Sequence, residues 1–259
     1  MRRLVLVPAL SVFLSVFQSV SLSVVLSVFL FGSLGCRGEA AREDQRRATA
    51  PPAGSAAAPV RPGDARPKIP KIVVLGDSLT AGLGLPSDEA YPSLLQERLN
   101  RAGLDFEVVN AGVSGDTSAG GLSRLDWALQ GDVRILIVAL GGNDGLRGLP
   151  TDAMSQNLSE IIEKARAQHV RVILAGMEAP PNYGRDYIVS FHRVYPDLAR
   201  RYNVALVPFL LQNVAGIDSL NQRDGIHPTA AGARIVADNV WSVLRPMAEA
   251  QKGEGRTGS

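Results

Sequence analysis

The stretch Lys71–Asp77, KIVVLGD, is a short run of β-branched and other apolar residues that ends in a turn. Nearly continuous apolar runs of this length are typical of strands that are covered on both faces of a sheet. Further runs of this kind follow along the chain: FEVVNAG at Phe106–Gly112, ILIVALGGN at Ile135–Asn143, RVILAGM at Arg171–Met177 and ALVPF at Ala205–Phe209. The sequence therefore predicts five strands.

Longer amphipathic stretches separate these runs and predict helices at about 88–102, 116–129, 151–168, 184–202 and 229–247. Strand and helix alternate throughout, which indicates a parallel sheet with helices on both faces, a three-layer α/β/α fold. Ligands of such sheets bind at the carboxyl ends of the strands. We therefore look for chemistry at that edge.

Composition narrows the function classes. The chain has 259 residues, 46% of them apolar, and a formal net charge of +2. It has no basic stripe, so we expect no nucleic-acid partner. The single cysteine, Cys36, excludes an internal disulfide and a cysteine-rich metal site.

The N-terminus has the plan of an export signal. Arg2 and Arg3 precede an apolar stretch, Leu4–Leu34, that is also long enough to span a bilayer. The sequence GSLGC at Gly32–Cys36 resembles a bacterial lipoprotein signal, although Ser33 stands where that family usually has Leu. We expect residues 1–36 to be a signal peptide or a lipoprotein signal, with an uncleaved anchor as the alternative. The protein would then be exported, as a periplasmic protein or a lipoprotein anchored through Cys36.

Composition also sets the domain boundaries. Residues 37–68 are rich in Ala, Pro and Arg and poor in large apolar side chains, which predicts a disordered tether. We expect one folded domain at 69–248, a disordered tail at 249–259, and a monomer whose membrane contact runs only through the N-terminal segment or its lipid.

Three predicted strand ends carry clusters of polar residues and glycine: Gly76-Asp77-Ser78, Asn110-Ala111-Gly112 and Gly141-Gly142-Asn143-Asp144. A serine in a tight turn after a buried strand has an exposed hydroxyl, and it becomes a nucleophile where a base removes its proton. Ser78 is therefore a candidate nucleophile. Its commoner alternative is a serine that caps a turn or a helix.

His227 is the best candidate for the base among three histidines. It lies in DGIHP at 224–228, between the last predicted strand and the last helix, whereas His169 ends one helix pattern and His192 lies within another. Asp224, three residues before His227, can accept from Nδ1 of the imidazole and leave Nε2 to face the serine. An ordinary turn aspartate is the alternative for Asp224.

Hydrolysis of a carbonyl compound also needs donors for the developing oxyanion. Gly112 lets its backbone N–H approach a substrate closely, Asn143 offers a side-chain amide, and Ser78 offers its own N–H. A turn glycine and an Asx-turn asparagine are the simpler interpretations.

Four ordered blocks, GDSLT at Ser78, NAGVSGDTSAGG at Gly112, GGNDGLRG at Asn143 and DGIHPT at His227, resemble those of the SGNH (GDSL) hydrolase superfamily. The likeness runs from about Lys71 to Trp241. The phrases GLSRLDWAL, GGNDGLRGLP and GMEAPPNYG further resemble its bacterial periplasmic thioesterase I / lysophospholipase L1 / arylesterase branch.

The resemblance implies a flavodoxin-like sheet of order 2-1-3-4-5, no metal and no cofactor, and hydrolysis of acyl esters, thioesters and lysophospholipids. It implies Ser78, His227 and Asp224 as catalytic residues, with oxyanion donors from Ser78, Gly112 and Asn143. Loops at Gly145–Pro150 and Glu178–Tyr187 would contact substrate. The alternatives are a carbohydrate O-deacetylase, a phosphate- or flavin-binding module, and a binding protein that has lost hydrolysis. A G-x-S-x-G elbow is excluded, since Thr80 stands where its second glycine would be.

Overall fold

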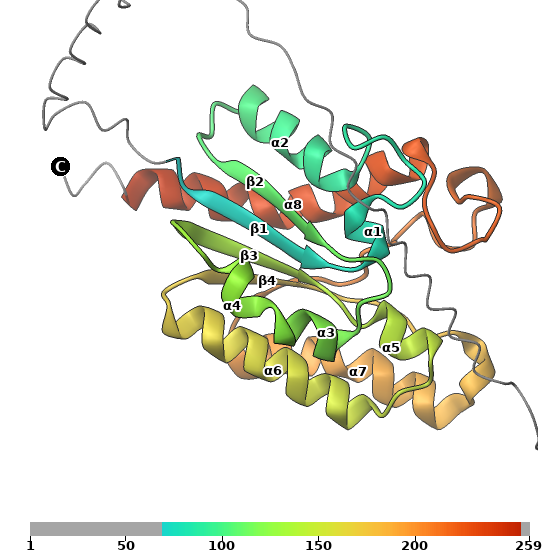
Figure 1. Cartoon of the computed structure of the whole chain (residues 1–259). Coiled ribbons are helices and arrows are strands. Elements are labelled where there is room, and N and C mark those ends of the chain that lie inside the picture. Colours follow the sequence, from blue (N-terminus) through green and yellow to red (C-terminus); the bar gives the residue numbers. More distant parts are fainter. Residues whose placement is uncertain (1–68, 255–259) are drawn as a thin grey trace, which may run out of the picture. The chain divides into compact units, whose positions relative to one another are not determined.

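The computed structural model describes residues 69–254, with side chains through Lys252. Its centre is a five-stranded parallel sheet of order β2-β1-β3-β4-β5, as expected (Figure 1). The predicted signal at 1–36 and the predicted tether at 37–68 lie outside the described residues. No helix of the described part is both long and apolar enough to cross a membrane.

Each strand takes its place from an apolar run. The central strands β1 and β3 pair in parallel along their whole length and are buried on both faces. Strand β2 lies at the edge and is partly exposed. The strands are β1 (Lys71–Gly76), β2 (Glu107–Gly112), β3 (Val133–Ala139), β4 (Arg171–Ala175) and β5 (Ala205–Val207).

Helices cover both faces of the sheet. Helices α2 and α8 lie side by side on one face, and α3, α4, α6 and α7 cover the other (Figure 1). The helices are α1 (Ser78–Ala81), α2 (Tyr91–Arg101), α3 (Ser118–Ser123), α4 (Leu125–Ala128), α5 (Gly142–Leu146), α6 (Thr151–Ala167), α7 (Arg185–Tyr202) and α8 (Ala230–Glu254), with 3-10 turns η1 (Pro181–Tyr183) and η2 (Asp218–Leu220).

Several predicted boundaries of helices and strands were wrong, and most of them lie at the carboxyl ends of the strands. The predicted strand 135–143 ends at Ala139, because Gly141 has φ 108° and turns the chain into the short helix α5. Helix α1 directly after β1 was not predicted. The predicted helix 116–129 is two helices, α3 and α4, which meet at Arg124.

The domain also extends beyond its predicted end at Ala248. Helix α8 continues to Glu254, so the predicted disordered tail 249–259 begins with helix. Lys252 in its last turn donates from Nζ to the carbonyl of Gly103 (2.5 Å), which ties this end of α8 to the end of α2. Residues 255–259 lie outside the described part.

Candidate active site

Ser78 is the first residue of α1 and follows β1 by a single residue, Asp77. Asp77 caps this helix, because its Oδ1 accepts from the N–H of Leu79 (3.0 Å). The first N–H groups of a helix have no acceptor within it, so the N–H of Ser78 stays available. The turn after β1 thus presents both a hydroxyl and an amide of one residue.

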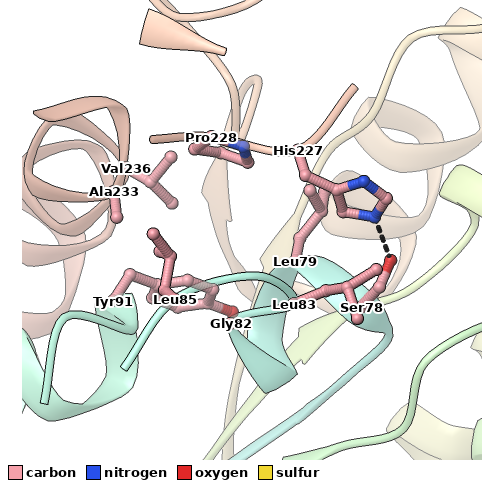
Figure 2. Close-up of a pocket in the computed structure, with 10 residues that line it drawn as sticks. All are labelled: Ser78, Leu79, Gly82, Leu83, Leu85, Tyr91, His227, Pro228, Ala233 and Val236. Atoms are coloured by element: carbon pink, nitrogen blue, oxygen red, sulfur yellow. Dashed lines mark hydrogen bonds between the residues drawn. The ribbon is translucent and has the colours of Figure 1, made fainter. Parts of the chain in front are cut away.

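His227 reaches Ser78 from the loop between β5 and α8. Its Nε2 lies 2.9 Å from Ser78 Oγ, the contact drawn as a dashed line in Figure 2. Its Nδ1 lies 2.7 Å from Oδ2 of Asp224. The structure therefore brings together the three residues that the sequence singled out as nucleophile, base and orienting carboxylate.

Asp224 is kept ionised by its own loop. Its Oδ1 accepts from the N–H of His227 (3.0 Å) and from the N–H of Ile226 (2.9 Å). These backbone donors, followed by the side chain of His227, hold the pKa of Asp224 well below its usual range. An ionised Asp224 fixes the imidazole proton on Nδ1, and Nε2 is then free to accept from the hydroxyl of Ser78.

Hydrogen bonds around Gln222 hold the loop that carries Asp224 and His227. The N–H of Gln222 donates to the carbonyl of His227 (2.7 Å). Its side-chain Nε2 donates to the carbonyls of Leu83 (2.8 Å) and Pro228 (3.0 Å). Gln222 thereby links the base loop to the segment that follows α1.

Asn143 lies in the first turn of α5. Its Nδ2 donates to the backbone carbonyl of Asp116 (2.9 Å) and, at the longer distance of 3.3 Å, to Oδ2 of Asp77. The side chain is thus oriented by two acceptors, one on the loop after β2 and one on the turn after β1.

Asp77 lies in the polar cluster after the first strand, and the sequence predicts no role for it. The residue is only 3% exposed. Burial raises the pKa of Asp77 to about 6, against the opposing effects of the Leu79 N–H, the nearby His227 and the Asn143 amide. A buried carboxyl group therefore lies beneath both Ser78 and Asn143.

The structure does not support Gly112 as an oxyanion donor. Its N–H already donates to Oδ1 of Asn110 (3.0 Å). A Cβ at this position would collide with the backbone of Ala81, so the glycine is needed for the close packing of α1 on β2. Gly115 offers an alternative amide: it has φ +84°, and its N–H has no hydrogen-bond acceptor among the described residues.

Two hollows flank the Ser78–His227 pair. The larger is a cleft of about 400 Å³ that reaches from Asn143 past Ser78 to His227. Its walls are mainly apolar and include Leu79, Leu146, Met177, Ala179, Pro180, Pro181, Phe209, Leu211, Ala215 and Ile226. The two segments expected to contact substrate both line this cleft: Gly145–Pro150 through Leu146, and Glu178–Tyr187 through Glu178–Pro181.

The smaller hollow lies on the α1 and α8 side of the pair. It measures about 10 Å³ and is lined by side chains that include Leu83, Leu85, Tyr91 and Val236, as Figure 2 shows. Space of this size holds about one water molecule at most. A long chain therefore fits only the larger cleft.

The other two histidines lie outside this arrangement. His169 follows α6 at the surface, with φ 60°. His192 is exposed on α7, where its Nδ1 lies 2.8 Å from Oε1 of Glu178. Glu178 lines the cleft, whereas His192 does not. Within residues 69–252 there is no group of three or more His, Cys, Asp or Glu side chains placed to hold a metal ion.

Comparison with known families gives one matching model. Residues 74–235 match the GDSL-like Lipase/Acylhydrolase family. The matched segment contains Asp77, Ser78, Asn143, Asp224 and His227.

Curated relatives match the same domain. The chain is 48% identical over 177 residues to Esterase TesA of Pseudomonas aeruginosa, covering 68% of this chain and 88% of that protein. It is 38% identical over 177 residues to Thioesterase 1/protease 1/lysophospholipase L1 of Escherichia coli K12, covering 68% of this chain and 84% of the relative.

Solved structures agree on the fold. A crystal structure of TesA is similar with a TM-score of 0.66 and 46% identity, over 68% of this chain and 98% of that one. The esterase AlinE4, described as an SGNH-hydrolase family esterase, gives a TM-score of 0.59 and 41% identity over 71% of this chain and 98% of its own.

Proposed function

The chain belongs to the GDSL-like lipase/acylhydrolase family and is a GDSL esterase, and from that premise we propose that it hydrolyses acyl esters through Ser78, His227 and Asp224. The observation that carries the proposal is the hydrogen-bonded chain from Ser78 Oγ (2.9 Å) through the imidazole to Asp224 (2.7 Å). This is the geometry that a serine needs to act as a nucleophile.

The first step is acylation of Ser78. Ser78 Oγ attacks the ester carbonyl while His227 Nε2 takes the hydroxyl proton, and Asp224 stabilises the imidazolium that forms. The imidazolium then gives this proton to the leaving alcohol or thiol as the carbonyl carbon–heteroatom bond breaks. An acyl group remains on Ser78.

The second step releases the acid. Water attacks the acyl-enzyme, His227 takes a proton from it, and the same proton returns to Ser78 Oγ as the ester bond to the enzyme breaks. No group beyond the substrate and water is consumed. His227 ends in the neutral state in which it began.

The oxyanion formed in both steps needs preorganised donors. The N–H of Ser78 is free at the start of α1. Asn143 lines the cleft, and the bond of its amide to Asp77, at 3.3 Å, is the weaker of its two hydrogen bonds. We assign the third donor to the N–H of Gly115 in place of Gly112. The carbonyl of Gly115 accepts from Arg147 (2.8 Å), and the carbonyl of Asp116 accepts from Asn143 (2.9 Å). These two bonds hold the backbone of Gly115 and Asp116 near Asn143.

The cleft supports substrates with an aliphatic acyl chain. Its mainly apolar walls and its volume of about 400 Å³ suit a hydrocarbon chain better than a hydroxylated sugar ring. Relatives named thioesterase and lysophospholipase are consistent with thioesters and lysophospholipids as further substrates. An O-deacetylase would need polar groups in this cleft to bind its sugar, so we rank that function second.

We also propose that the enzyme is exported through the signal at 1–36 and works as a monomer at or beyond the membrane. The positively charged start and the apolar stretch 4–34 support export. Mass spectrometry of the mature N-terminus tests this directly. A lipid-modified Cys36 or a cleaved N-terminus supports it, and an intact Met1 on protein recovered from the cytosol contradicts it.

Purified parent enzyme and Ser78→Ala test the main proposal on p-nitrophenyl esters of two to sixteen carbons, an acyl-CoA, a lysophospholipid and an acetylated sugar. We expect turnover of acyl esters by the parent and a loss of at least about 10⁴-fold in Ser78→Ala, the usual cost of a missing nucleophile. Equal rates for the two proteins would overturn the proposal. Turnover of the acetylated sugar alone would favour the deacetylase.

A further inference from the structure

Arg124 lies where α3 meets α4, and its guanidinium turns back to the sheet. Its Nη2 donates to the carbonyl of Gly76 (2.8 Å), the last residue of β1, and its Nη1 donates to the carbonyl of Ala111 (2.7 Å) near the end of β2. Neither carbonyl belongs to the helix that carries Arg124. One side chain therefore joins the carboxyl ends of two neighbouring strands just beneath Ser78.

The third arm of the guanidinium binds a carboxylate. Arg124 Nε donates to Oδ2 of Asp116 (2.6 Å), and the two side chains are only 17% and 18% exposed. Charge-assisted bonds of this length are stronger than neutral ones, and a planar guanidinium donates to three separate acceptors from three nitrogens, whereas the donors of a lysine share one nitrogen. The loop after β2 is thus fastened to the strand ends through Asp116.

Asp116 also contacts Asn143, the proposed oxyanion donor, through its backbone. The carbonyl of Asp116 accepts from Asn143 Nδ2 (2.9 Å). Arg124 and Asn143 therefore hold Asp116 at opposite ends, one by its carboxylate and the other by its backbone. Any shift of Asp116 moves both Asn143 and the adjoining peptide of Gly115.

We propose that Arg124, through its ion pair with Asp116, is the positioning residue that sets Asn143 and the Gly115 amide relative to Ser78. The inference rests on the proposed function and adds a residue that touches no substrate. Arg124 acts on the nucleophile turn through Gly76 and on the donors through Asp116, so it fixes the distance between them. Misplacement of reacting groups by about 1 Å costs on the order of 100-fold in rate.

The test uses Arg124→Lys, Arg124→Gln and Asp116→Ala in the full-length enzyme. Asp116→Ala removes the carboxylate but keeps the carbonyl that Asn143 uses, so it carries the test if the Arg124 variants do not fold. Turnover of p-nitrophenyl butyrate is measured per active site titrated with a fluorophosphonate. We expect kcat per titrated site to fall by about 10- to 100-fold with KM within about threefold, the lysine variant losing least.

A matched control is Arg134→Gln, which breaks the exposed pair of Arg134 with Asp132 (2.6 Å) away from the site. We expect it to keep the parent kcat. A purely structural role of Arg124 would lower the number of titratable sites and leave kcat per site unchanged, and that result would overturn the inference.

Coupling to Asn143 gives the second readout. In an Asn143→Ala background the Arg124 and Asp116 substitutions should cost less than they do in the parent enzyme, because one of the two donors that they position is already absent. An undiminished cost in that background would overturn the inference. If Ser78→Ala is inactive and Asn143→Ala is impaired while the Arg124 variants match the parent, the inference fails and the proposed function stands. Parent rates for Ser78→Ala would instead overturn the proposed function itself.

Discussion

The nucleophile side and the base side of the site are held in different ways. Ser78 follows the buried strand β1 and its neighbour Asp77, which is 3% exposed. Arg124 binds the ends of β1 and β2 through the carbonyls of Gly76 and Ala111. His227 lies in a loop whose neighbours Asp224, Gly225 and Ile226 are all exposed. The hydrogen bonds of this loop are short-range, apart from those of His227 with Ser78 (2.9 Å) and of Gln222 with Leu83 (2.8 Å).

The two carboxylates of the site show the same contrast. Burial raises the pKa of Asp77 to about 6, whereas backbone donors lower the pKa of exposed Asp224. The sheet core therefore positions the nucleophile, and a local hydrogen-bond network positions the base. Substitutions on the nucleophile side should therefore change stability and activity together, and those on the base side should change activity alone.

The largest effect is expected at His227 on the base side. His227→Ala should lower kcat by at least about 10⁴-fold, since no group remains to take the proton of Ser78. The urea midpoint should change little, because His227 lies on a loop outside the buried apolar core. A stability loss as large as that of a core substitution would contradict the contrast. His192→Ala, which removes an exposed histidine outside the cleft, is the control and should keep the parent kcat.

Asn143→Ala should have the next largest effect. Loss of one oxyanion donor typically costs about 10²- to 10³-fold in kcat. Steady-state kinetics should show this loss in kcat with KM little changed, since the donor acts on the transition state. Asn143→Asp would serve as the shape-matched control and should be at least as impaired. A loss confined to KM would place Asn143 in substrate binding instead.

Asp77→Asn tests the buried side through pH. The pKa of Asp77 is about 6 in the folded protein, against an ordinary value of 3.8, so between these pH values the folded protein holds a proton that the unfolded chain has released. This group therefore makes the protein less stable as pH rises from about 4 to about 6, by about 3 kcal/mol in all. Asparagine keeps the helix cap without the titration.

The measurement for Asp77→Asn is the free energy of unfolding in urea at several values between pH 4 and pH 7. The difference between variant and parent should grow in favour of the variant as pH rises through this interval. A difference that does not change with pH would contradict the raised pKa of Asp77.

The smallest effect is expected at Gln222. Gln222→Ala removes the side-chain bonds to Leu83 (2.8 Å) and Pro228 (3.0 Å), which loosens the base loop. We expect kcat/KM to fall by about 3- to 10-fold and stability to change by less than about 1 kcal/mol. Gln212→Ala, at an exposed position, is the control. A stability loss with unchanged kcat/KM would contradict the expectation that this loop affects activity and not stability.

Sequence reasoning predicted the strands from local apolar runs, and the resemblance to SGNH hydrolases implied the sheet order and the roles of Ser78, His227 and Asp224. Apolar runs marked the strands, the polar and glycine clusters marked the strand ends, and the spacing of Asp224 and His227 fits within one loop. Sequence reasoning failed where the role of a residue depends on a contact with a residue far away in the sequence. Gly112 looked like an open donor, but it is a glycine because α1 packs on it and its N–H is taken by Asn110.

Arg124 and Asp77 show the same limit. Nothing in a helix pattern at 116–129 indicates that one arginine interrupts it and binds the ends of β1 and β2. The raised pKa of Asp77 likewise comes from burial beneath the site, which single-sequence patterns do not report. Both residues were visible in quoted motifs, GLSRLDWAL and GDSLT, as polar side chains among apolar or small neighbours.

The central claim is that Ser78 is the nucleophile, and the most direct test is the site of covalent modification. The purified enzyme is treated with a fluorophosphonate and digested, and the peptide that carries the phosphonate is sequenced by mass spectrometry. Our account predicts one adduct, on Ser78 Oγ, with loss of esterase activity in proportion to labelling and no adduct in Ser78→Ala. An adduct on another residue, or full activity after complete labelling of Ser78, would contradict it.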